Sequence, residues 1–140
     1  MGAWGIGHFE NDAATDWLFD LENDGSSALR APLMRATEPE ALEANEASEA
    51  LAAAVVIAAA RDGLGAGLPE RAAAWLSEHR REVSLEDQEL AARAVTRVAT
   101  DSELLDLWRE ADGERWSAAV QDLRARLVSV GERSGAEERS

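Results

Sequence analysis

The sequence predicts an all-α fold: a single compact bundle of five to six helices, with an extended N-terminal segment docked on it. Three observations predict this fold class. Apolar residues recur at intervals of three and four through most of the 140 residues, which is the period of a helix with one buried face. Residues typical of helix starts and stops separate these stretches. No stretch shows the strict apolar and polar alternation of a half-buried strand.

The chain has the length of one domain, since domains commonly contain about 100–150 residues. We expect residues 1–130 to form a single helical domain. Residues 131–140 are polar and poor in apolar side chains, and they are expected to form a flexible C-terminal tail.

The first helix is expected to follow an extended opening. Residues 1–10 contain three glycines and lack helical periodicity. Asn11 and Asp12 are both good N-cap residues, and the apolar positions that follow them recur at helical spacing. Gly25 can take the left-handed conformation that often ends a helix. A short second helix, disturbed by a proline, is expected over 26–34.

A capping-box pattern predicts the start of the third helix. The Thr37 side chain can cap a helix, and the Glu40 side chain can accept a hydrogen bond from the Thr37 backbone N–H. The third helix is therefore expected to run from here to about Asp62. A glycine-rich connector over 63–67 follows, and Pro69 then opens a fourth helix.

The rest of the chain predicts two more helices. Ser84 and Asp87 resemble another capping box at the start of a fifth helix, which breaks or kinks near residues 100–102. The last helix has the cleanest apolar periodicity and is expected from about Glu114 to Val130.

The charge of the chain is strongly negative and unevenly distributed. The net charge is −14; residues 1–60 carry 11 acids and two arginines, and residues 61–140 carry 17 acids and 12 arginines. A polyanion repels phosphate backbones and anionic membrane surfaces, so neither nucleic acid nor a membrane is an expected partner. The chain contains no cysteine, which excludes disulfides and thiolate chemistry.

No targeting segment is visible in the sequence. Residues 1–20 lack the basic start and continuous apolar stretch of a signal peptide. The longest apolar run, 51–60, is half of the roughly 20 residues that a membrane span needs, and it predicts a helix buried on nearly all sides. We therefore expect a cytoplasmic protein.

Several segments resemble a known family. The opening MGAWGIGHFENDAATDW closely resembles the signature of an uncharacterised bacterial family, the domain of unknown function 4259. Similar pieces follow at Trp75-Leu76, from Ser102 to Trp108, and from Trp116 to Leu127. The resemblance implies a small helical domain and adds no activity, substrate or cofactor. At position 8 this chain has His8 where the family pattern has another residue, so the resemblance implies no family-wide catalytic role there.

The opening signature is the first candidate site. Its glycines would let backbone N–H groups approach an anion or a peptide near the positive end of the first helix. The candidate binding residues are Gly2, Trp4, Gly5, Gly7, Phe9, Asn11 and Asp12. No strand precedes them and no phosphate-loop pattern follows. The structural interpretation is favoured: Trp4 and Phe9 plug the core, and the glycines permit tight turns.

A histidine and four acids form the second candidate. Asp12, Asp16 and Asp20 are four residues apart, so they line one helix face, and with His8 and Glu10 they would suit a divalent cation. Successive turns place the outer pair about 12 Å apart, and the spacing matches no strong metal motif. The favoured interpretation is a solvated face, and we predict no tightly bound metal and no cofactor.

The leading functional hypothesis is a non-enzymatic interaction module with an acidic face that engages a basic partner protein. Small acidic bacterial proteins that neutralise toxins or form complexes work in this way. No convincing catalytic set is present, because the chain lacks cysteine, lysine, tyrosine and a GxSxG elbow. The alternative is a carboxylate-based, metal-dependent hydrolase built on Glu10, Asp12, Asp16 and a histidine. A third possibility is self-association in a homo-oligomer.

Overall fold

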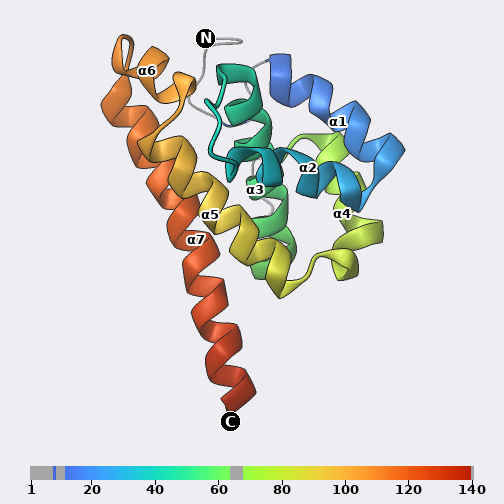
Figure 1. Cartoon of the computed structure of the whole chain (residues 1–140). Helices are drawn as coiled ribbons and strands as arrows, with labels where there is room; N and C mark the ends of the chain where they lie inside the picture. Colours follow the sequence, from blue (N-terminus) through green and yellow to red (C-terminus); the bar gives the residue numbers. More distant parts are fainter. Residues whose placement is uncertain (1–7, 9–11, 64–67, 140) are drawn as a thin grey trace.

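The computed structural model describes residue 8, residues 12–63 and residues 68–139, with side chains through residue 128 (Figure 1). The predicted all-α class is confirmed, because helices account for most of these residues and no strand occurs among them. The helices are α1 (Asp12–Asp24), α2 (Ser26–Ala36), α3 (Ala44–Asp62), α4 (Glu70–His79), the 3-10 helix η2 (Arg80–Glu82), α5 (Leu85–Thr100), α6 (Glu103–Arg109) and α7 (Gly113–Arg139).

The prediction of five to six helices is wrong in number, because the described residues form seven α-helices. The additional helix is α6, which follows the break predicted near residues 100–102. The Ser102 hydroxyl accepts a hydrogen bond from the backbone N–H of Leu105 at 3.1 Å. This N-cap gives α6 a start of its own and separates it from α5.

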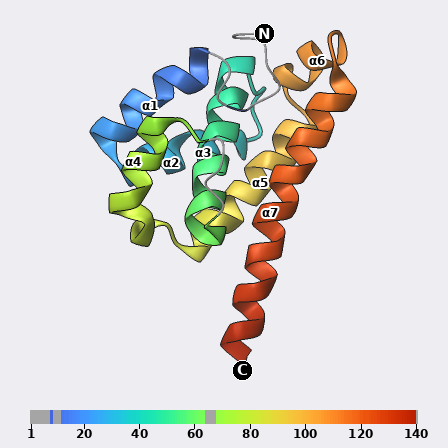
Figure 2. The ribbon, with the colours of Figure 1, turned by 180° about the vertical axis from the view of Figure 1, so that it is seen from behind.

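Helix α3 lies at the centre of the molecule (Figures 1 and 2). Helices α1, α2 and α4 lie on one side of it, and α5 and α7 lie on the other. Every residue of the run 51–60 except Val55 is buried, as expected for a helix covered on nearly all sides. The small alanine side chains of this run allow neighbouring helices to approach closely. None of the described helices is long and apolar enough to cross a membrane.

The boundary predicted at Thr37 is wrong. Helix α3 begins at Ala44, and its capping box is formed by Glu43 and Glu46, with the Glu43 backbone N–H donating to the Glu46 carboxylate at 3.0 Å. Thr37 instead ends α2, where its hydroxyl donates to the carbonyl of Met34 at 2.8 Å.

Tertiary contacts explain this difference, because Arg97 of α5 holds the connection between α2 and α3 outside any helix. Its guanidinium donates hydrogen bonds to the backbone carbonyls of Ala36, Glu38 and Glu40. Carbonyls that bind a side chain from another helix are fixed in a non-helical path, which overrides the local capping signal.

The capping box predicted at Ser84 is confirmed, and it is joined to α2. The Ser84 hydroxyl accepts from the backbone N–H of Asp87 at 3.2 Å, and the Asp87 carboxylate accepts from the backbone N–H of Ser84 at 3.0 Å. Arg30 donates to the same carboxylate at 2.7 Å. Burial alone would raise the pKa of Asp87, but the hydrogen bonds from Arg30 and Ser84 lower it below its usual range.

Helix α7 packs on the bundle with its first half and projects from it with its second (Figures 1 and 2). Trp116, Val120, Leu123 and Leu127 are buried, as their spacing predicts. The helical backbone continues through residues 131–139, where the sequence predicts a tail. The flexibility of that segment stays a prediction.

Candidate functional site

Most of the N-terminal signature lies outside the described residues. This applies to Gly2, Trp4, Gly5, Gly7, Phe9, Glu10 and Asn11. Both interpretations of the signature, core plug and binding segment, therefore stay predictions. Asp12 is the first residue of α1 and is exposed, and His8 is half-buried.

The structure places His8 against helix α7. Its imidazole is hydrogen-bonded to the backbone of Ala119 and lies within electrostatic reach of Arg126. Burial lowers the pKa of His8; the hydrogen bond to Ala119 opposes this shift, and the charge of Arg126 adds to it. Arg126 also donates two hydrogen bonds, at 2.9 and 3.1 Å, to the carboxylate of Asp62. His8 thus lies near a part-buried polar contact between α3 and α7.

The three aspartates of α1 that were candidate metal ligands are all exposed to solvent. Asp12, Asp16 and Asp20 follow one another at successive turns of the helix. Among the residues that the structure describes, no group of three or more histidine, aspartate and glutamate side chains is arranged to hold a metal ion. Glu10, the fourth ligand candidate, lies outside these residues.

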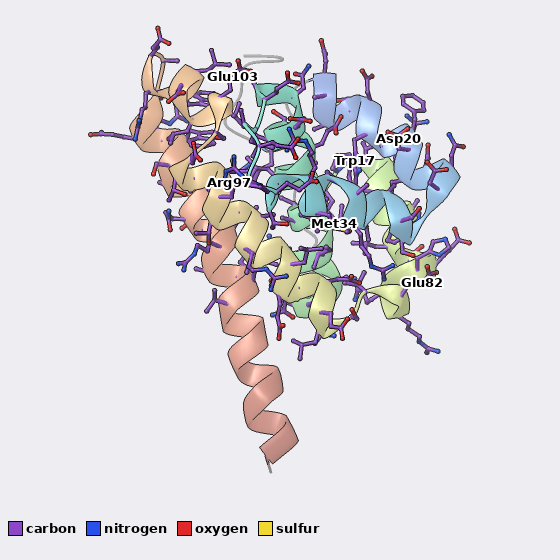
Figure 3. The ribbon with its side chains drawn as sticks, in the orientation of Figure 1. Trp17, Asp20, Met34, Glu82, Arg97 and Glu103 are labelled. Atoms are coloured by element: carbon purple, nitrogen blue, oxygen red, sulfur yellow. The ribbon has the colours of Figure 1, made fainter. Side chains whose placement is uncertain are left out.

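A groove of about 480 Å³ lies between α1, α2 and α3. Its deepest lining residues are apolar and buried: Trp17, Ala28 and Pro32. The indole N–H of Trp17 donates to the carbonyl of Ala28 at 2.9 Å, which fixes α1 against α2 at the bottom of the groove. Among the described residues, those that line the groove are Trp17, Asp20, Asp24, Ser27, Ala28, Ala31, Pro32, Arg35, Glu46 and Glu49. Figure 3 labels Trp17 and Asp20 at α1 and Met34 at α2.

The groove carries more negative than positive charge. Asp20 and Asp24 come from α1, and Glu46 and Glu49 come from α3. Of the described residues that line the groove, only Arg35 is basic; it donates to the Glu46 carboxylate at 2.9 Å. Among the described side chains, no arginine pairs with the other three acids.

Glu49 shows the effect of this imbalance most clearly. Its side chain is half-buried, and burial is the main cause that raises its pKa. The negative charges of Asp20, Glu46 and Asp16 raise the pKa further, in that order. The ionised Glu49 carboxylate is therefore both poorly solvated and repelled by its neighbours, which is the setting in which a positive group would be stabilised.

The sequence indicated only one wall of this site. The four-residue spacing of Asp16 and Asp20 correctly placed both on one face of α1. Glu46 and Glu49 were not singled out from the sequence, so their part in the groove was missed. Their three-residue spacing beside an alanine-rich buried face was the available signal.

The chain was compared with known proteins. A family model described as "Domain of unknown function (DUF4259)" matches residues 2–119. No curated protein and no solved structure matches the chain.

Proposed function

Because the chain belongs to the family of the domain of unknown function DUF4259, whose description gives no activity, we propose its function from the groove. The protein is a non-enzymatic interaction module, and its acidic groove binds a basic surface of a partner protein. Complex formation and the neutralisation of a toxin are both tasks of this kind.

One observation carries the proposal: carboxylates from two helices meet in one groove without a matching number of cations. Asp20 and Glu49 approach from α1 and α3, and Glu49 is half-buried. A buried charge is expensive unless it is paired. A partner that brings a positive group therefore gains the attraction and also relieves repulsion that is already present in the free protein.

The overall charge supports the same function. Residues 1–60 contain the whole of α1 and α2 and most of α3, and they carry 11 acids against two arginines. A surface with one dominant sign of charge steers an oppositely charged partner and speeds its association. The face that contains the groove is therefore also the face that attracts a basic protein.

The hydrolase alternative rests on His8, Glu10, Asp12 and Asp16. Asp12 and Asp16 are exposed on α1, whereas His8 lies against α7. Self-association through the groove would need a basic surface on a second copy of the chain. The groove favours the interaction module over both alternatives.

The test is capture from native lysate at low salt, with wild type and a groove variant compared. Asp20→Asn combined with Glu49→Gln removes two charges from the groove. Glu114→Gln combined with Asp122→Asn removes two charges from exposed positions on α7 and serves as the control. We expect one basic protein to be retained by wild type and the control, released by about 0.3 M NaCl, and lost by the groove variant.

Two outcomes would contradict the proposal. One is capture of the same protein by wild type and groove variant alike. The other is metal in near-stoichiometric amount in protein purified without chelators, which would favour the hydrolase.

A further inference from the structure

We propose that the groove between α1, α2 and α3 receives a single arginine side chain of the partner, with the guanidinium held between Asp20 and Glu49. The inference rests on the proposed function and names the chemistry of the group that is recognised. It distinguishes a defined pocket from a diffuse attraction between two charged surfaces.

The apolar bottom of the groove suits the stem of a long basic side chain. Trp17, Ala28 and Pro32 lie there, and Ala31, which also lines the groove, continues this surface along α2. Arginine and lysine bury their methylene groups on apolar surface while the charged head reaches a polar rim. The rim here is acidic, so the groove complements such a side chain in both polarity and charge.

The placement of the acids favours a guanidinium over an ammonium group. Asp20 and Glu49 belong to different helices, both line the groove, and the negative charge of Asp20 acts on Glu49. A guanidinium has five N–H donors in a planar fork, whereas an ammonium group is a compact point charge. The guanidinium is also more weakly hydrated, so it enters a partly apolar groove at lower cost.

Arg35 already shows this chemistry at the edge of the groove. Its guanidinium donates to the Glu46 carboxylate at 2.9 Å and to the Ala41 carbonyl at 2.8 Å, so one fork joins α2 to α3. The incoming arginine would make the equivalent connection between α1 and α3, at Asp20 and Glu49.

Glu49 should oppose folding at neutral pH while it promotes binding. Because its pKa is raised in the folded protein, the protonated form is favoured there. The stability that this gives is fully present below the ordinary pKa of 4.5 and is lost as pH rises through the raised value. Glu49→Gln is therefore expected to melt at or above the wild-type temperature at pH 7. Substitution of a residue that only supports the fold would lower the melting temperature.

The experiment uses the full chain and three small probes. N-acetyl-arginine methylamide is titrated against the ¹⁵N-labelled protein, and the indole N–H resonance of Trp17 is followed by NMR. That resonance is one of five tryptophan indole signals and is assigned with Trp17→Phe. The lysine analogue tests the preference for guanidinium, and the citrulline analogue, a neutral copy of arginine, tests the need for charge.

We expect saturable movement of the Trp17 resonance with the arginine probe. The lysine probe should bind more weakly, and the citrulline probe should leave the resonance in place. Glu49→Gln should weaken arginine binding about tenfold, the effect of losing one charge-assisted hydrogen bond. Glu114→Gln, which removes the same charge from an exposed position on α7, should bind as wild type does.

The proposal is overturned if the arginine probe leaves the Trp17 resonance unmoved, if citrulline or lysine binds equally well, or if Glu49→Gln binds as wild type does. In each case, a basic partner that is still captured and still lost with the two-site groove variant would leave the proposed function standing. If wild type captures no basic partner although it binds the arginine probe, the proposed function is rejected instead.

Discussion

His8 gives the molecule a site at which protonation opposes folding. Its folded pKa lies below the ordinary value of 6.5, because burial and Arg126 disfavour the imidazolium. Its stabilising contribution is therefore complete above pH 6.5 and is lost as pH falls through the lowered folded value. We predict that wild type loses stability relative to His8→Gln as pH falls below 6.5 and through the lowered folded pKa. Urea unfolding at a series of pH values measures this difference.

The comparison with a second histidine isolates the effect. His79 stacks on Trp75 and pairs with Glu82 at the end of α4, away from α7. A His79→Gln variant carries the same chemical change, so it controls for the general protonation of acids. If the free energy of unfolding depends on pH in the same way in His8→Gln and His79→Gln, the imidazole of His8 is not the group that causes the pH dependence.

Single residues were the hardest feature to predict from the sequence. The sequence indicated that Asp16 and Asp20 share a face, because that follows from helical period alone. The environment of Glu49 depends on which helix packs opposite it and on how deeply it is covered, and neither is encoded in local spacing. A raised pKa at this glutamate therefore required the tertiary structure.

At the scale of elements, Arg97 fixes the connection between α2 and α3. Arg97→Met keeps the aliphatic stem but removes the donors to the carbonyls of Ala36, Glu38 and Glu40. We predict a loss of about 2 kcal/mol in the free energy of unfolding, because hydrogen bonds from a charged donor are the stronger kind. Chemical denaturation measures it. Arg93→Met, at an exposed position one turn earlier, should change stability little; equal losses in both variants would refute this role.

Helix boundaries could be predicted where the signal is local. Ser84 caps α5 as its sequence indicates, since both partners of that capping box lie within one turn. Thr37 and Glu40 carry a similar pattern, but the carbonyl of Glu40 binds Arg97 from a distant part of the chain. Local propensity is a weak determinant and tertiary contacts override it. Helix α6 was expected only as a continuation after a kink, although the Ser102 cap that starts it lies within one turn.

At the scale of the whole molecule, the net charge of −14 should make stability depend on salt. Repulsion among exposed acids acts over about 30 Å at 0.01 M salt and about 8 Å at 0.15 M. We predict that the melting temperature rises by a few degrees when NaCl is raised across this range, as calorimetry would show. An unchanged or lower melting temperature would mean that ion pairs such as Asp62 with Arg126 outweigh the repulsion.

The alanines of α3 have a consequence for residues that they do not contact. Ala50 and Ala53 lie one helical turn after Glu46 and Glu49, on the same side of α3, and both are buried. A larger side chain at either position would wedge α3 away from the helices packed against it. The distance between α1, which carries Asp20, and α3, which carries Glu49, thus depends on the volume of buried side chains such as Ala50 and Ala53. Selectivity of the groove can be tuned by changes in volume in the core while every charged residue at its rim stays the same.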